Sequence, residues 1–253
     1  MSIYEISFSP TGGTKKVADF LANELGKNIT CVDLSNRNED FRKFSLAKDD
    51  IAVVAVPSYS GRVPSIATER ISMIHGNGAK AIIVCVYGNR AYEDTLVELQ
   101  DIVQQAGFSV VSAVVAIAEH SIAHRYAKNR PDNDDYVNLK EFAYKIKEKL
   151  KKNDFTTPEI PGNRPYRKAG RVGLVPKATK ACTGCGFCAS KCPVGAINSS
   201  NPEKVDNKAC ISCMRCVSLC PHNARKLNGL IIAVVNVMLK KSCSVRKECE
   251  LYL

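Results

Sequence analysis

The chain has 253 residues, of which 45% are hydrophobic, and this length suits one ordinary domain joined to a smaller one. It carries 36 Lys and Arg against 25 Asp and Glu, which gives a formal net charge of +11. Almost all of this excess lies after residue 152, where no aromatic-spaced RNA-binding signature accompanies it, so a nucleic-acid partner is not expected.

A candidate anion-binding loop follows the first predicted strand, which runs over residues 3–8. The loop is Ser9, Pro10, Thr11, Gly12, Gly13 and Thr14, and a helical pattern with Val17, Leu21 and Leu25 on one face begins directly after it. Backbone N–H groups at a helix N-terminus point at an anion, and the helix dipole favours negative charge. The spacing fits neither a dinucleotide fingerprint nor a Walker A loop. The loop is therefore predicted to hold a phosphate group.

Strands and helices alternate through the rest of the first 152 residues. Strands are expected over 29–34, 51–56, 81–87 and 108–118, and helices over 64–74, 92–106 and 134–152. Nearly continuous apolar strands that alternate with helices indicate a parallel sheet covered on both faces. Such a sheet binds its ligand at the carboxyl ends of the strands, at the switch point between the first and the third strand.

The loops after the third and fourth strands are therefore expected to face the ligand. The third-strand loop offers Pro57, Ser58, Tyr59 and Gly61, and the fourth-strand loop offers Gly88, Asn89, Arg90 and Tyr92. Tyr59 supplies an aromatic ring for stacking, although ordinary surface packing is the alternative for both tyrosines. His120 and His124 follow the fifth strand. No Glu follows the first of them in a zinc-protease pattern, so a capping or interface role is expected.

A duplicated cysteine motif dominates the second half of the chain. The spacing C-x2-C-x2-C-x3-C-P occurs twice, 28 residues apart, and this spacing wraps cubane iron–sulfur clusters with the fourth Cys crossing to the other cluster. The first cluster is assigned Cys182, Cys185, Cys188 and Cys220, and the second Cys210, Cys213, Cys216 and Cys192. A pair of structural zinc sites is the alternative, but zinc has no use for the evenly stepped third Cys. The segment resembles a bacterial-type ferredoxin with two 4Fe-4S clusters.

The whole order resembles the flavodoxin–ferredoxin fusion proteins of anaerobes, because the lettering S-x-T-G-x-T of the first loop is similar to that of the flavodoxin phosphate loop. This resemblance implies FMN at the loops above and a doubly wound α/β sheet of order 2-1-3-4-5, followed by a small α+β ferredoxin domain. The expected units are a flavodoxin-like domain over 1–152, a linker over 153–175, a ferredoxin-like domain over 176–229 and a helical tail over 230–253.

The expected function is electron transfer between FMN and the two clusters, as a low-potential carrier between redox partner proteins. The alternative is an FMN-dependent oxidoreductase that reduces a small molecule with electrons supplied through its clusters. No catalytic residue is predicted for either function.

The localisation expected from the sequence is cytoplasmic. The N-terminus lacks a signal-peptide pattern, and cluster thiolates require a reducing compartment. The longest apolar run, 230–239, is far below the ~18 residues needed to span a bilayer. The tail is expected to dock on the domains, with a role at a membrane surface as the alternative.

Overall fold

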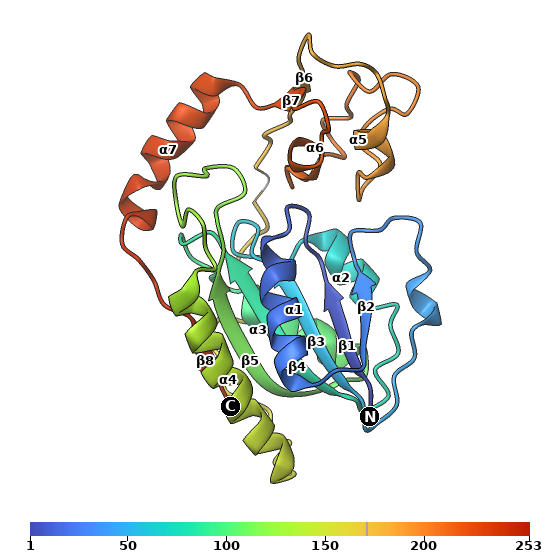
Figure 1. Cartoon of the computed structure of the whole chain (residues 1–253), viewed down its shortest axis with the longest axis vertical. Helices are drawn as coiled ribbons and strands as arrows, with labels where there is room; N and C mark the ends of the chain where they lie inside the picture. The colour runs from blue at the N-terminus through green and yellow to red at the C-terminus, as the bar shows by residue number, and fades with distance from the viewer. Residues whose placement is uncertain (171) are drawn as a thin grey trace.

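A computed structural model describes residues 1–170 and 172–253 of the chain (Figure 1). Its main sheet contains the parallel strands β1 (Ile3–Ser7), β2 (Ile29–Asp33), β3 (Ile51–Pro57), β4 (Lys80–Tyr87) and β5 (Ser109–Ile117). These strands lie in the order β2-β1-β3-β4-β5. The predicted doubly wound sheet of order 2-1-3-4-5 is therefore confirmed, and this is the flavodoxin-like order.

Helices cover both faces of the sheet. Helices α1 (Gly13–Leu25) and α4 (Asn133–Lys151) lie on one face, and α2 (Ser65–Ile71) and α3 (Thr95–Gln105) lie on the other (Figure 1). Successive side chains of a strand point to opposite faces, so Val53 and Val54 of β3 enter two different hydrophobic cores. Burial on both faces explains why the strands read as continuous apolar runs. A short 3-10 helix, Phe41–Lys43, lies between β2 and β3 in the chain.

The tail differs in part from the prediction of a helix over 230–253. Helix α7 runs over Gly229–Cys243, but Glu250–Tyr252 form strand β8, which pairs antiparallel with β5. An open edge of a sheet presents unpaired N–H and C=O groups, and β8 covers the edge that β5 would otherwise expose. Among the described residues, no helix is long and apolar enough to cross a bilayer.

The cysteine-rich unit contains four short elements. Strand β6 (Lys177–Ala178) pairs antiparallel with β7 (Arg225–Lys226), and the helices α5 (Phe187–Ser190) and α6 (Arg215–Ser218) lie between them in the chain. Figure 1 shows this unit above the carboxyl ends of β1 and β3. The preceding segment 153–170 forms no helix or strand and is fastened to α3. For example, Asn163 donates two 2.9 Å hydrogen bonds to Asp94, through its backbone N–H and its side chain.

Candidate functional site

A cavity of about 470 Å³ lies at the carboxyl ends of the parallel strands; we call it the strand-end cavity. Its walls come from the loops after β1, β3, β4 and β5, from residues 211–212 of the cysteine-rich unit and from α7. Most residues predicted to bind the flavin line it: Pro10, Thr11, Gly13, Thr14, Pro57, Ser58, Tyr59, Gly88 and Arg90. Ser9, Gly12, Gly61, Asn89 and Tyr92 are not among the lining residues.

The first loop is arranged as an anion site. Gly12 takes a left-handed backbone with φ +92, which only glycine adopts without strain, and this turn starts α1 at Gly13. The Ser9 hydroxyl accepts a 2.8 Å hydrogen bond from the Lys15 N–H, so it fixes the loop from behind. The side chains of Thr11 and Thr14 line the cavity beside the first N–H groups of α1, which have no intrahelical acceptor.

The loop after β3 is held in one conformation by its neighbours. The N–H of Tyr59 donates to the carbonyl of Arg62, and the N–H of Arg62 donates back to that of Tyr59. Glu98 accepts from the Arg62 guanidinium at 2.7 and 2.8 Å and from the Val63 N–H at 2.8 Å. Burial, and then the neighbouring thiol of Cys213, raises the pKa of Tyr59 well above its usual value. The Tyr59 ring therefore has a fixed position in the wall of the strand-end cavity, near the cysteine-rich unit.

Two residues that the sequence predicts to bind the flavin form hydrogen bonds with the C-terminal tail of the chain. Asn89 donates 2.8 Å hydrogen bonds to the carbonyls of Cys243 and Val245, and its amide oxygen accepts from the Lys247 N–H. The Tyr92 hydroxyl donates to Glu250 at 2.8 Å. Both side chains therefore anchor the segment that leads from α7 to β8. Nothing in the local sequence of this loop indicates that the tail returns to it.

His120 is a cavity residue that sequence reasoning placed only in a capping or interface role. Its Nδ1 accepts hydrogen bonds from the N–H groups of Ile122 and Ala123 at 3.2 and 3.1 Å. Burial, and then the charge of His124, lowers the pKa of His120 to about 4, so the imidazole is neutral and carries its proton on Nε2. Its ring packs against Gly88, where a Cβ atom would lie 2.7 Å from the ring.

A second, smaller cavity lies inside the cysteine-rich unit; we call it the cysteine cavity. The cysteines that line it are Cys192, Cys210, Cys213 and Cys216, the set predicted to bind the second cluster. The backbone accounts for this grouping, because the Asp206 N–H donates to the carbonyl of Ala196 at 2.7 Å and the Cys210 N–H donates to that of Asp206 at 3.0 Å. These two hydrogen bonds fold the segment between the motifs so that Cys210, the start of the second motif, comes close to Cys192, the fourth Cys of the first.

The other predicted set has a matching arrangement around β6 and β7. The Thr179 N–H donates to the carbonyl of Ala224 at 2.8 Å, and the Cys182 N–H donates to that of Thr179 at 2.9 Å. The Ala224 N–H in turn donates to the Cys220 sulfur at 3.2 Å, as the Ala196 N–H does to the Cys192 sulfur at 3.3 Å. The structure therefore places Cys192 beside the cysteines of the second motif, and the bonds of Ala224 connect the Cys220 end of the second motif to the start of the first.

Both cysteine loops repeat the same backbone. Gly184 and Gly186 have φ values of 71, and the equivalent residues 28 positions later, Ser212 and Met214, have φ values of 56 and 61. A left-handed backbone at a non-glycine residue costs of order 1 kcal/mol or more, so the second loop retains this shape against strain. Such strain concentrates at ligand-binding sites, where the surroundings enforce it.

The pKa shifts of Cys213 and Cys216 differ in direction from that of Cys220. Burial raises the pKa of Cys213 to about 11 and that of Cys216 to about 12, so these thiols keep their protons until a metal ion displaces them. For Cys220, burial raises the pKa, but backbone N–H groups of Ala224, His222 and Arg225 outweigh it and lower the value. N–H groups that point at a sulfur stabilise its thiolate form.

Polar atoms without partners remain at both cavities. The Ser212 hydroxyl at the strand-end cavity, and the Nε atoms of Arg215 and Arg225 at the cysteine cavity, are buried and have no hydrogen-bond partner among the described residues. A hydroxyl suits the polar edge of a bound ring system, and two guanidinium groups suit an anionic cluster. The donors present therefore fit a flavin in the first cavity and an iron–sulfur cluster in the second.

The two cavities share a wall. Ile211 lines both of them, Ser212 lines the strand-end cavity and Cys213 lines the cysteine cavity. Two arginines fix this contact. Arg215 donates to the carbonyl of Ser9 at 3.3 Å, and Arg70, which is 6% exposed, donates to the carbonyls of Leu34 and Pro193 at 2.6 and 2.7 Å.

Comparison with protein families identifies the cysteine-rich unit. Residues 181–224 match the model of the 4Fe-4S dicluster domain. The chain joins a flavodoxin-like domain to a 4Fe-4S dicluster domain. No curated protein matches the chain in sequence.

Several solved flavodoxins are similar to the flavodoxin-like domain. One from Streptococcus pneumoniae is 22% identical, with a TM-score of 0.44 over 58% of this chain and 99% of its own. A flavodoxin from the Archaea is 13% identical, with a TM-score of 0.43 over 60% of this chain and 99% of its own. Flavodoxin 1 from Bacillus cereus is 15% identical, with a TM-score of 0.42 over 58% of this chain and 98% of its own. The fold assignment depends on the strand order, not on these similarities.

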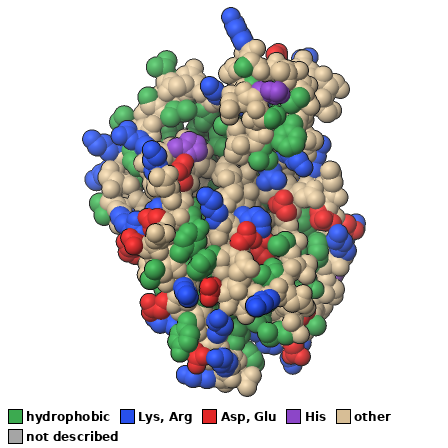
Figure 2. Space-filling model, viewed as in Figure 1, with side chains coloured by type: hydrophobic (Ala, Val, Ile, Leu, Met, Phe, Trp, Pro, Cys, Tyr) green, Lys and Arg blue, Asp and Glu red, His purple; other side chains and the backbone are tan. Residues whose placement is uncertain are grey.

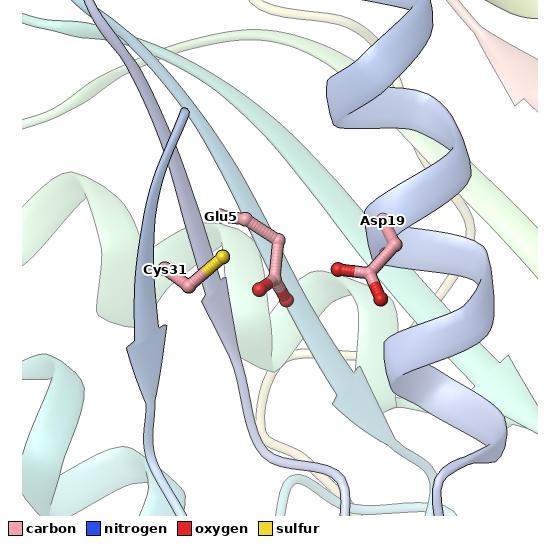
Figure 3. A group of neighbouring side chains, drawn as sticks. All are labelled: Glu5, Asp19 and Cys31. Atoms are coloured by element: carbon pink, nitrogen blue, oxygen red, sulfur yellow. The ribbon is translucent and has the colours of Figure 1, made fainter. Parts of the chain in front are cut away.

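The flavodoxin-like domain also contains a group of potential metal ligands that lines neither cavity. Glu5, Asp19 and Cys31 project toward one another from β1, α1 and β2 (Figure 3). Lys15 already binds both carboxylates, at 3.1 Å from Glu5 and 2.6 Å from Asp19. Burial lowers the pKa of Lys15, but its hydrogen bonds with Asp19 and Glu5 outweigh this effect and raise it. The ammonium group therefore occupies this acidic cluster.

Proposed function

We propose that the chain is an electron-transfer protein that binds FMN in the strand-end cavity and two 4Fe-4S clusters in the dicluster domain, and that exchanges electrons with redox partner proteins. The wall shared by the two cavities carries this proposal, because Ile211 lines both. Two cofactor sites that have a lining residue in common suit electron exchange within the chain.

The residues around the strand-end cavity supply what FMN requires. Thr11 and Thr14, with the N-terminus of α1, bind the phosphate. Tyr59 would supply an aromatic wall for the flavin ring, and the His120 Nε2–H and the Ser212 hydroxyl would supply hydrogen-bond donors for its polar edge. The neutral state of His120 supports this assignment, because a neutral imidazole donates a hydrogen bond without adding charge beside the ring.

The dicluster domain binds the clusters through two crossed sets of thiolates. Cys182, Cys185, Cys188 and Cys220 hold one cluster, and Cys210, Cys213, Cys216 and Cys192 hold the other. A flavin accepts two electrons and releases them singly, whereas a 4Fe-4S cluster carries one at a time. Arg215 and Arg225 place positive charge at the cysteine cavity, and this charge favours a more anionic cluster there.

Cofactor analysis of the anaerobically purified chain tests the proposal. We expect about eight iron and eight sulfide atoms per chain, from two cubane clusters, and one FMN. A zinc-loaded chain without flavin would contradict the proposed function. Steady-state assays with a reduced ferredoxin then separate a carrier from an oxidoreductase, since a carrier reduces protein acceptors and shows no turnover with small-molecule acceptors.

The phosphate loop gives a prediction about ligand preference. The double variant Thr11→Ala/Thr14→Ala should weaken FMN binding by at least roughly 100-fold, because each hydroxyl that bonds a charged group contributes about 1.5–3 kcal/mol. Riboflavin lacks the phosphate, so its affinity should change little. Fluorescence titration of the flavin-free protein with both ligands measures this. Equal weakening of the two ligands would mean that the loop does not hold the phosphate.

Arg215 gives a prediction about the clusters. Its side chain is only 15% exposed, and its backbone N–H lowers the pKa of Cys213 against the larger effect of burial. A charge at such a site contributes on the order of 1–2 kcal/mol. Arg215→Gln should therefore lower the potential of the Cys210–Cys216 cluster by tens of millivolts and leave the other cluster largely unchanged. A redox titration followed by electron paramagnetic resonance measures both. No change in either potential would mean that Arg215 serves only its contacts to the Ser9 carbonyl and the Asp33 carboxylate.

A further inference from the structure

Helix α7 packs on the rest of the molecule through one narrow side. Val235 and Leu239 pack against Ala123 and Tyr126 in a small hydrophobic cluster, and the Tyr126 hydroxyl donates to the carbonyl of Asn236. The same side of the helix contributes to the wall of the strand-end cavity. In Figure 1, α7 lies along the outside of the molecule, between the dicluster domain and the flavodoxin-like domain.

The opposite side of α7 is apolar and exposed. Leu230 is 79% exposed, Val234 58% and Val237 75%. These residues follow one another by four and three positions, so they lie on one side of the helix; we call them the outer face. A helix that leaves such a face in water loses the burial that normally stabilises it, so the outer face indicates a binding surface.

The charged residues of the chain segment that contains α7 all have one sign. From residue 207 to residue 247 the chain contains eight Lys and Arg and no Asp or Glu. Lys226 precedes the helix, Lys240 and Lys241 form its last turn, and all three are exposed. Figure 2 shows hydrophobic and basic side chains together in this part of the surface, with most acidic side chains over the flavodoxin-like domain below. An apolar face with cations at both ends complements an anionic lipid surface.

We propose that the outer face of α7 docks the protein onto the surface of an anionic lipid bilayer, with the helix in the plane of the headgroups. A second copy of the chain fits less well. Antiparallel pairing of two α7 helices would bring Lys226 of each copy toward Lys240 and Lys241 of the other, and parallel pairing would bring identical lysines together. No acidic residue between 207 and 247 compensates either arrangement. The lone, convex helix offers no groove to a partner helix, whereas a lipid interface needs none.

The docking inference goes beyond the proposed electron transfer and does not depend on it. Because the inner side of α7 lines the strand-end cavity, docking would bring that cavity to the membrane surface. The test uses the protein with its native cofactor content and vesicles of phosphatidylcholine, either pure or mixed with an equal amount of phosphatidylglycerol. Co-sedimentation at low and high salt measures binding.

We expect binding to the mixed vesicles that falls with added salt, and little binding to pure phosphatidylcholine. Val237→Glu should weaken it by at least about tenfold, and Lys240→Gln/Lys241→Gln by about 30-fold, the effect of two surface cations. Val137→Glu is the matched control. Val137 is 67% exposed on α4, so the same substitution there should leave binding unchanged. Iron and flavin content of each variant verifies that it is folded.

Absence of wild-type binding to the mixed vesicles overturns the proposal, as does equal binding by Val237→Glu and Val137→Glu. Analytical ultracentrifugation without lipid tests the alternative occupant of the outer face, a second copy of the chain. If the protein does not bind vesicles but forms a dimer that Val237→Glu dissociates, the outer face is a contact with a second copy of the chain.

Discussion

Cys192→Ser is expected to remove the cluster built around Cys210, Cys213 and Cys216, and to leave the cluster nearer to Cys192 in sequence intact. The physical reason is the crossing of the chain: Cys192 lines the cysteine cavity with the three thiols of the second motif. Loss of one thiolate of four leaves an incomplete cubane site. Iron should fall from about eight to about four atoms per chain, and electron paramagnetic resonance should lose one of its two reduced-cluster signals.

Cys243→Ser is the matched control for this variant. Cys243 is 3% exposed and belongs to neither predicted set, so its replacement should leave the iron content unchanged. The variants Cys192→Ser and Cys210→Ser should have the same residual spectrum, because both remove a ligand of the same cluster. A residual spectrum of Cys192→Ser that instead equals that of Cys188→Ser would contradict the crossed assignment.

The sheet and the cysteine sets could be predicted from the sequence because their signals are local and periodic. Apolar runs such as 51–56 indicate strands that are buried on both faces of the sheet, and the 28-residue repeat indicates a duplicated loop. The same repeat could not show that Ser212 and Met214 keep the left-handed backbone of the glycines that they replace. That conformation depends on the surroundings of the loop, not on the intrinsic preference of either residue.

The rest of the site depends on contacts between distant segments. Asn89 and Tyr92 have the polar groups expected of flavin-binding residues, yet both bind the returning tail, which is more than 150 residues away in the chain. The contact between the two cavities also joins segments that are far apart in the sequence, since Arg215 donates a hydrogen bond to the carbonyl of Ser9, 206 positions earlier. A pattern of period two or 3.6 reports which side of an element is buried, but not which segment buries it.

The tail also leads to the largest expected loss of stability. Arg130 binds Asp135 through Nε at 2.8 Å and through a second, shorter contact, and their side chains are 4% and 0% exposed. Arg130 also donates to the carbonyl of Lys247 at 2.7 Å, just before β8. Burial lowers the pKa of Arg130, but the bonds to Asp135 outweigh it, so the pKa is raised and the pair stays charged.

Arg130→Met should therefore lower the free energy of unfolding by about 3–5 kcal/mol, because it leaves the Asp135 carboxylate buried with only weaker partners. Urea unfolding of the flavin-bound protein, followed by flavin fluorescence, measures the change. Arg164→Met is the control: Arg164 binds Asp101 in an ion pair but is 53% exposed, so its loss should cost no more than about 1 kcal/mol. Equal losses in the two variants would show that the Arg130–Asp135 pair is as well solvated as a surface pair. Hydrogen exchange gives a second readout, since release of Lys247 should raise the exchange rate of the β8 amides before the rest of the sheet is affected.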